Sequence, residues 1–322
     1  MIVVWRVTQK CNLSCPFCAY DRRVIRPRKE ADPELMRRFG VVLAEYERRT
    51  GDAVLVSWIG GEPLLWRPLT GLTVFFSAEL DLRVSTTTNG TSLVSSAVRE
   101  HVLEHYTELT VSVDGIGEAH DELRGWPGGY RALRESVRWL AAAKRSRERG
   151  PRLRANVVLM RQTIGGFEAL CRELAGWGIE EITFNQLGGR DRPEFFPAHR
   201  LLPEQAEWLA RKVPALRTRL GRLGVRLKGG EGYLDRILAS SRDARVPVAD
   251  CHPGQRFVFI NEDGMAAPCD FTTESYGVPL AELDCVEALR GLPVRLAQRR
   301  RERTAAACRD CHSTQVFEKF AV

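Results

Sequence analysis

The pattern of hydrophobic and polar positions alternates between two kinds of segment along roughly the first 190 residues. Short β-branched runs predict six strands, at Val3–Val7, Ala53–Trp58, Leu82–Thr87, Leu109–Val113, Leu153–Met160 and Glu181–Asn185. Helix-period segments lie between them; one begins at Asp32-Pro33, and another, Phe167–Trp177, is closed by Gly178. This alternation predicts an α/β fold with a parallel sheet and right-handed crossovers. Because six units are too few for a closed eight-stranded barrel, we expect a partial (βα)6 TIM-like barrel.

The pattern changes after about residue 190. Residues 203–224 predict one or two helices, interrupted at Pro214. A short strand at Arg256–Ile260 is followed by Asn261-Glu262-Asp263-Gly264, which is typical of a hairpin turn. We therefore expect residues 1–235 to form the barrel and residues 236–322 to form a small C-terminal domain.

Composition narrows the class of protein only a little. The chain has 322 residues and a formal net charge of +7, and it contains no run of about 18 apolar residues that could span a membrane. The N-terminus does not have the pattern of a signal peptide, so we expect a cytoplasmic protein. The positive charge permits a polyanionic partner, but no compact nucleic-acid-binding motif is present, and nucleic acid is not the expected partner.

Nine cysteines need an explanation, because the reducing cytoplasm disfavours disulfides and favours metal ligation. Cys11, Cys15 and Cys18 form a C-x3-C-x2-C loop directly after the first strand. Three thiolates can ligate three irons of a [4Fe–4S] cluster and leave the fourth iron open to another ligand. From spacing alone, a zinc site with a distant fourth cysteine is the alternative.

This loop, with Phe17 before its last cysteine, resembles that of the radical S-adenosylmethionine (SAM) superfamily. The resemblance implies that SAM chelates the fourth iron. Reductive cleavage of SAM then yields a 5′-deoxyadenosyl radical, which abstracts a hydrogen atom from an unactivated carbon. It also implies an external electron donor such as flavodoxin or ferredoxin.

Later strand ends extend the resemblance. Gly60-Gly61-Glu62-Pro63 resembles the family's GGEP motif, and His120-Asp121-Glu122-Leu123-Arg124-Gly125 resembles an HDxxRG segment of the subfamily with C-terminal cluster domains. Glu62 suits the SAM ammonium group, while Ser112 and Arg124 would face the ribose and the carboxylate. The full set of SAM-binding residues that the resemblance implies is Phe17, Gly60, Gly61, Glu62, Pro63, Thr88, Asn89, Ser112, Asp114, Arg124 and Asn156.

A second group of cysteines lies near the C-terminus, at Cys251, Cys269, Cys308 and Cys311. The first two, with Gly264 between them, resemble the opening of SPASM and twitch domains, and the last two supply a closing C-x2-C. The resemblance implies that these four residues hold an auxiliary [4Fe–4S] cluster, giving two clusters in all. Because no cysteine follows Cys311, the shorter twitch domain is favoured; zinc is the alternative.

Catalytic residues are harder to assign. Cys171 lies on the apolar face of a helix and Cys285 precedes one, so both are interpreted first as packing residues. Either could instead donate a hydrogen atom to a substrate radical, or Cys285 could be a cluster ligand that frees Cys251 for that role. Asp191, in a charged loop after the sixth strand, and Glu231, in a glycine-rich segment, are candidate bases, although both segments could be ordinary loops.

The substrate hypothesis that we rank first is an amino sugar or aminocyclitol natural product, which would be dehydrogenated or epimerised. The alternative is a maturase that crosslinks or epimerises a ribosomally made peptide. Because the barrel begins at residue 2, no room is expected for an N-terminal peptide-binding domain, and this lowers the peptide hypothesis. RNA modification ranks below both.

Overall fold

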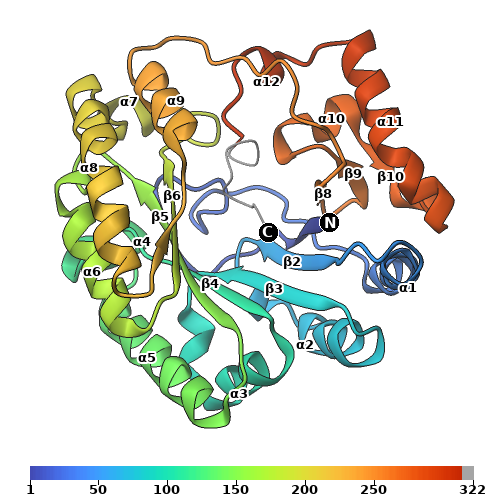
Figure 1. The fold of residues 1–322 in the computed structure, drawn as a ribbon, viewed down its shortest axis with the longest axis horizontal. Helices are drawn as coiled ribbons and strands as arrows, with labels where there is room; N and C mark the ends of the chain where they lie inside the picture. The colour runs from blue at the N-terminus through green and yellow to red at the C-terminus, as the bar shows by residue number, and fades with distance from the viewer. Residues whose placement is uncertain (314–322) are drawn as a thin grey trace.

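A single curved sheet surrounded by helices organises the chain (Figure 1). The computed structural model describes residues 1–313. In these residues the sheet has ten strands in the order β10-β9-β8-β1-β2-β3-β4-β5-β6-β7. Their bounds are β1 (Ile2–Thr8), β2 (Leu55–Gly60), β3 (Arg83–Thr88), β4 (Glu108–Ser112), β5 (Arg152–Leu159), β6 (Glu181–Gln186), β7 (Arg226–Leu227), β8 (Phe257–Ile260), β9 (Met265–Ala267) and β10 (Val278–Pro279).

The parallel core agrees with the predicted partial barrel. Strands β1 to β6 pair in sequence order, and every pair is parallel. Two additional strands flank this core: β7 pairs with β6, and β8 pairs with β1, both in parallel. The predicted turn at Asn261–Gly264 is confirmed, because β8 and β9 pair antiparallel across it and Gly264 has a φ of 72°. The fold is therefore α/β with a mainly parallel sheet.

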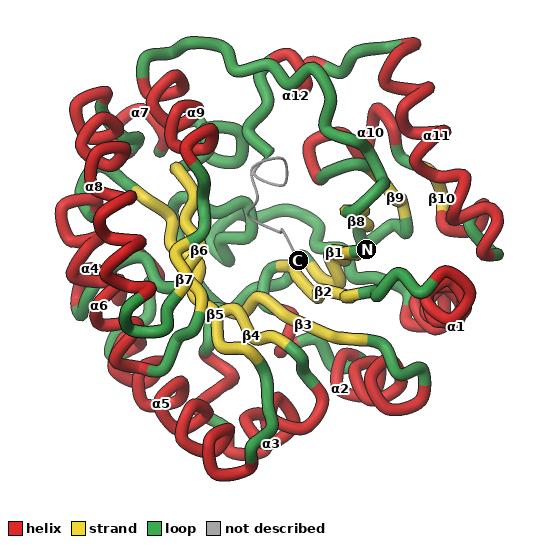
Figure 2. The backbone as a smooth tube through the Cα atoms, in the orientation of Figure 1, coloured by secondary structure: helices red, strands yellow, loops and turns green. Residues whose placement is uncertain are grey.

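Helices cover most of the outer face of the sheet, while α12 lies at the open side, between α9 and α11 (Figure 2). They are α1 (Pro33–Thr50), α2 (Leu69–Val74), α3 (Ser96–His105), α4 (Glu118–Arg124), α5 (Gly129–Arg147), α6 (Phe167–Trp177), α7 (Phe196–His199), α8 (Pro203–Gly221), α9 (Glu231–Ser241), α10 (Thr273–Tyr276), α11 (Val286–Glu302) and α12 (Ala306–Arg309). A π-helical turn at Phe75–Glu79 and short 3-10 turns complete the backbone. None of the described helices is long and apolar enough to cross a membrane.

The core lies between the sheet and these helices. Trp5 on β1 and Trp58 on β2 are almost fully buried and point outward, where Trp5 meets Phe39 of α1 and Trp58 meets Phe76 edge-on. Because side chains alternate along a strand, Val4 and Ser57 face the interior of the barrel instead. The outer layer thus supplies stability, and the inner layer is available for a site.

One helical prediction was wrong. Helix α8 continues through Pro214 without interruption. Its buried face includes Leu209 and Val213 before the proline and Leu216 after it. An internal proline costs about 3 kcal/mol, and burial of this continuous apolar face offsets that cost.

The predicted domain boundary, between residues 235 and 236, falls inside α9 and stays a prediction. The second region is not separate from the sheet of the first, because β8 extends that sheet beside β1. Arg6 of β1 strengthens the junction: its Nε lies 2.6 Å from Glu262 and its Nη1 lies 2.7 Å from Asp270. The end of the predicted second domain, residues 314–322, lies outside the described residues.

Candidate active site

The three N-terminal cysteines lie in the loop that leaves β1 at the carboxyl end of the sheet. Polar hydrogens surround their sulfur atoms: Leu13 N lies 3.5 Å from Cys11 Sγ, and Tyr20 N lies 3.3 Å from Cys18 Sγ. The Asn89 side-chain amide, after β3, also points at Cys11 Sγ, at 3.7 Å. Donors of this kind stabilise thiolate sulfur, and they tune clusters that thiolates hold. The loop therefore fits the three-thiolate cluster that its spacing predicts.

The glycines of the Gly60-Gly61 pair let the cluster loop lie directly on the end of β2. Gly61 N donates to Thr8 O and Glu62 N donates to Lys10 O, both at 2.8 Å. A Cβ atom on Gly60 would lie 2.3 Å from Thr8 O, and one on Gly61 would lie 2.1 Å from Lys10 O. Only glycine permits this approach of two backbones.

Glu62 ties the ends of three strands together. Its carboxylate accepts hydrogen bonds from Thr88 Oγ1 and Asn89 N, both at 2.7 Å, and from Leu64 N at 3.1 Å. The side chain is fully buried. Burial raises the pKa of Glu62 to about 7, although the hydrogen bonds from Asn89 and Thr88 lower it. Since three of about four acceptor positions are used by the protein, the expected contact with the SAM ammonium group stays a prediction.

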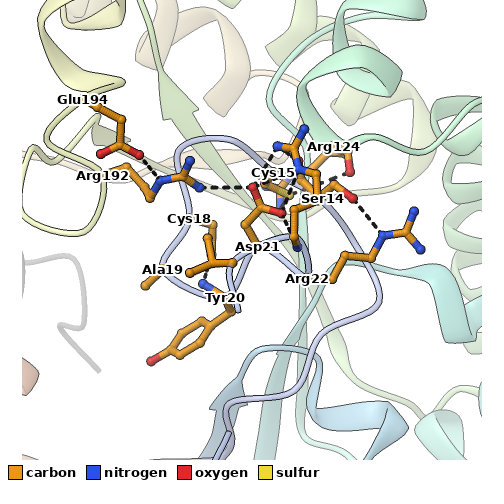
Figure 3. Close-up of polar contacts among 12 residues, drawn as sticks. Ser14, Cys15, Cys18, Ala19, Tyr20, Asp21, Arg22, Arg124, Arg192 and Glu194 are labelled. Carbon is orange, nitrogen blue, oxygen red and sulfur yellow. Dashed lines mark hydrogen bonds and ion pairs between the residues drawn. The ribbon is translucent and has the colours of Figure 1, made fainter. Parts of the chain in front are cut away.

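Arg124 lies against the cluster loop at Ser14 and Cys15 (Figure 3). Arg124 Nη1 lies 3.9 Å from Cys15 Sγ, and its guanidinium lies over the Phe17 ring, 5.5 Å from the centroid. The Arg124 carbonyl accepts from Ser14 N at 3.4 Å. The guanidinium is itself fixed by Asp114, at 2.6 Å. The structure thus places Arg124 against the cluster loop, while its expected contact with the SAM carboxylate is untested.

The remaining predicted SAM-binding residues lie at neighbouring strand ends. Ser112 and Asn156 are register partners on β4 and β5. The Asn156 Oδ1 atom accepts from Thr183 and Asn185 of β6, both at 3.0 Å. Asp114 accepts from Val158 N at 2.8 Å, and its own backbone N–H donates to His120. Pro63 begins the short 3-10 turn that follows Glu62. The predicted residues therefore gather at one end of the sheet.

Sequence reasoning missed Asp21, which anchors the far end of the cluster loop. It is buried and pairs with Arg23 at 2.7 Å and with Arg192 at 3.1 Å (Figure 3). Burial alone would raise the pKa of Asp21, but hydrogen bonds from Arg23 and Arg192 outweigh it and lower the pKa to about 2. The available signal was weak, because Asp21 and Arg192 are 171 positions apart in sequence. This ion pair connects the cluster loop to the loop after β6.

The four C-terminal cysteines line one small cavity, together with Phe271, Tyr276 and Arg300. Thr272 Oγ1 lies 3.4 Å from Cys269 Sγ, and the Tyr276 hydroxyl lies 3.8 Å from Cys308 Sγ. Burial raises the pKa of Cys269 to about 12. In residues 1–313, no three His, Cys, Asp or Glu side chains are arranged to hold a single metal ion. Four cysteines that line one cavity are nevertheless a donor set suited to an iron–sulfur cluster.

A larger cavity of about 650 Å³ lies between the barrel interior and this cysteine group. Barrel strands contribute Val4, Ser57, Thr87 and Asn185 to its wall, and the C-terminal region contributes Cys269 and Phe271. Asp191 lines it as well; the residue as a whole is exposed, but partial burial of its carboxyl raises the pKa of Asp191. Arg190 lies over the Phe271 ring at 4.8 Å. The cavity is the natural place for a substrate.

The other catalytic candidates lie away from this wall. Cys171 is fully buried in the core side of α6, where burial raises its pKa to about 12. Cys285 is exposed directly before α11, and Glu231 is exposed at the start of α9. None of the three is among the described residues that line the substrate cavity. Of the four candidates, only Asp191 lines the larger cavity.

An α/β barrel with a three-cysteine loop at the carboxyl end of its first strand defines a class of cluster-binding enzyme. The sequence model of the Radical SAM superfamily matches residues 5–174, more than half of the chain. The chain belongs to the radical SAM superfamily, and it accordingly uses SAM and a [4Fe–4S] cluster.

The chain is also similar to individual proteins with known names. The chain is 29% identical over 280 residues to PqqA peptide cyclase of Xanthomonas campestris pv. campestris, covering 83% of this chain and 66% of that protein. It is 27% identical over 186 residues to Fe-coproporphyrin III synthase of Methanosarcina barkeri, covering 58% of this chain and 44% of that protein. The chain thus spans less than half the length of the synthase. In fold it is similar to Streptococcus suis SuiB bound to precursor peptide SuiA, with a TM-score of 0.68, 16% identity, and coverage of 98% of this chain and 70% of that one.

Proposed function

We propose that the chain is a radical SAM maturase that crosslinks or epimerises a residue of a ribosomally made peptide. One observation carries this proposal. The similarity to PqqA peptide cyclase covers 83% of the chain, so it must reach beyond the barrel, and the substrate cavity is walled by both regions. The synthase, in contrast, covers only 58% of the chain. The peptide substrate is therefore ranked first. This reverses our ranking from the sequence, in which an amino sugar or aminocyclitol came first.

The residues of the first site have distinct roles in this proposal. Bound together, SAM and the cluster supply a 5′-deoxyadenosyl radical that abstracts a hydrogen atom. Cys11, Cys15 and Cys18 would hold the cluster, and the Gly60-Gly61 backbone and Arg124 fix the loop that carries them. The protein's contribution is therefore orientation, together with the exclusion of water from the reacting atoms.

The second cysteine group is proposed to hold an auxiliary [4Fe–4S] cluster. Cys251, Cys269, Cys308 and Cys311 supply four thiolates to one cavity, and hydroxyl groups of Thr272 and Tyr276 lie against two of the sulfurs. Cys269 also lines the substrate cavity, so the auxiliary site and the substrate would share a wall. From this position the auxiliary cluster would be able to accept one electron from the substrate radical.

Asp191 is the proposed base. It lines the substrate cavity, and burial raises the pKa of its carboxyl above the usual value, which makes the carboxylate a stronger base. A crosslink requires loss of one hydrogen atom, one proton and one electron from the peptide. Asp191 would take the proton, while the cavity wall at Cys269 offers the route for the electron.

The experiment is anaerobic incubation of the reconstituted protein with SAM, dithionite and synthetic precursor peptides encoded beside its gene. Mass spectrometry would detect the loss of two hydrogen atoms for a crosslink, and reaction in D₂O would detect deuterium uptake for an epimerised residue. Turnover of an aminocyclitol or amino sugar, with every such peptide unchanged, would replace the proposed function with the small-molecule alternative.

A further inference from the structure

The auxiliary cysteine group lies between two separate hollows. On its inner side, Cys269 and Phe271 line both the cysteine cavity and the substrate cavity. On its outer side, Val248, Arg300 and Cys308 line both the cysteine cavity and a surface cleft of about 500 Å³. One cysteine of the group therefore faces the substrate, and another forms part of the surface of the protein.

The outer cleft is formed by three segments that are distant in sequence. They are residues 247–253 after α9, the end of α11, and α12, which lie together at one rim of the molecule in Figure 1. The basic residues of the lining are Arg300, Arg301 and Arg309, and the acidic residue of the lining is Asp250. The Arg300 side chain is held in the wall of the cleft, because it lies 3.5 Å from Asp250 and donates to Val248 O. Arg301 and Arg309 are exposed.

We propose that this cleft, named here the Arg301–Arg309 cleft, is the docking site of an acidic one-electron carrier protein. The carrier exchanges an electron with the auxiliary cluster at Cys308, which lines the cleft. The inference rests on the proposed function in one respect, because it requires the auxiliary cluster. It goes beyond that function by assigning a partner and a surface.

The electron count balances when the substrate is oxidised and the carrier is reduced. Cleavage of SAM consumes one electron, and the substrate radical that remains after hydrogen abstraction gives up one proton and one electron. The electron reaches the auxiliary cluster, and the oxidised carrier then takes it and returns the cluster to its oxidised state. No bond is made or broken at the cleft, and the carrier's redox centre is the only group reduced there.

Charge and geometry favour a carrier over the peptide substrate at this cleft. The reacting part of the substrate must lie in the inner cavity, on the side of Cys269. Electron-transfer partners form small, weak complexes that depend on complementary charge. A basic cleft with a cluster ligand in its wall meets both requirements, because it attracts an acidic partner and brings it close to the redox centre.

The test uses oxidised flavodoxin as the probe. The doubly substituted variant Arg301→Glu/Arg309→Glu is compared with Arg138→Glu/Arg172→Glu, which makes the same charge change at a basic cleft between α5 and α6. Each holoenzyme is reduced, freed of dithionite and mixed with flavodoxin in a stopped-flow spectrometer, and the flavodoxin Kd is measured by calorimetry. Iron content and the electron paramagnetic resonance spectrum establish that both clusters are present, and Arg301→Gln/Arg309→Gln provides a milder second variant.

At low ionic strength we expect the first pair to slow electron transfer and weaken binding about tenfold, with less than a twofold effect of the control pair. Raising the salt concentration should slow the unmodified enzyme and affect the first pair little. The inference would be overturned if both variant pairs lost electron transfer to flavodoxin equally, or if neither lost any. It would also be overturned if the first pair weakened binding of the peptide substrate but left binding of flavodoxin unchanged. Zinc in the second site would also overturn it.

The assay contains no peptide, so it separates the two proposals. An enzyme that exchanges electrons through Arg301 and Arg309 but modifies no peptide would retain the docking site and lose the proposed substrate. An enzyme that modifies a peptide but shows no dependence on these arginines would lose only the docking site.

Discussion

Arg124 Nη2 lies 2.6 Å from Asp114 Oδ2, and both side chains are buried at the edge of the cluster loop. The same guanidinium lies 3.9 Å from Cys15 Sγ. The carboxylate of Asp114 neutralises the buried guanidinium, and it also directs this guanidinium toward Cys15. Neither role can be assigned from the HDxxRG motif alone.

Removal of the Arg124 guanidinium should destabilise the fold. Arg124→Met would leave the Asp114 carboxylate buried without its partner, and we expect the free energy of unfolding of the metal-free protein to fall by about 3–5 kcal/mol. Urea denaturation measures this change. Arg192→Met is the matched control, since its partner Asp21 keeps Arg23, and about 1 kcal/mol or less is expected. Equal losses in the two variants would show that the Arg124–Asp114 pair has no special role.

Because of Glu62, the free energy of unfolding of the metal-free protein should depend on pH. Its pKa is raised from 4.5 to about 7 by burial, so the folded state favours the protonated carboxyl. The resulting stability is fully present below about pH 4.5 and is lost as the pH rises through about 7, a change of about 3 kcal/mol.

The measurement is the free energy of unfolding of the metal-free protein from pH 5 to pH 8, with Glu62→Gln as the control. The difference between the two proteins isolates Glu62 from other titrating groups, such as His120, whose pKa burial lowers to about 3. A difference that is constant across this range would contradict the raised pKa.

The two cysteine groups should be separable by iron analysis. Cys11→Ala, Cys15→Ala and Cys18→Ala together should abolish 5′-deoxyadenosine formation, because no thiolate would hold the SAM-binding cluster. Cys308→Ala with Cys311→Ala should remove about half of the iron and leave SAM cleavage in place. Cys285→Ala, at an exposed position outside both groups, is the control and should retain all the iron. Unchanged iron in the Cys308 and Cys311 variant would exclude the auxiliary cluster.

Asp191 should be needed after hydrogen abstraction rather than before it. Asp191→Asn removes the proposed base, so we expect 5′-deoxyadenosine to form while the modified peptide falls by about 10²–10⁴-fold. Glu231→Gln changes an exposed carboxylate outside the cavity and should have no such effect. The ratio of 5′-deoxyadenosine to product, measured by chromatography, is the readout. If Asp191→Asn keeps the unmodified ratio, another group takes the proton.

The sequence was sufficient for the features that depend on neighbouring residues. The six strands were predicted within about two residues, because their apolar runs are bounded by clear turn signals. The cluster loop and the Gly60-Gly61 pair were found because their spacing is fixed by local geometry. The structure added the reason for the glycines: a Cβ on either one would collide with the backbone of the cluster loop.

Features that join distant segments were not predictable in the same way. The parallel pairing of β1 with β8 connects residues about 255 positions apart, and nothing in either strand specifies its partner. Arg6, a cation within an otherwise apolar strand, was the one available signal, because it needs a buried acid and finds Glu262. Pro214 misled the prediction, since its local penalty is visible in sequence and the packing that offsets it is not.

The place of β1 in the sheet has a consequence for how the chain folds. Its neighbours are β2 on one edge and β8 on the other, so β1 is completed by a strand that lies about 255 positions later in the chain. Such non-local pairing raises contact order and slows folding. Until residue 257 is synthesised, the edge of β1 that precedes the cluster loop stays open to wrong partners. Assembly of the first cysteine loop and of the C-terminal region should therefore be a single cooperative event that waits for the synthesis of β8.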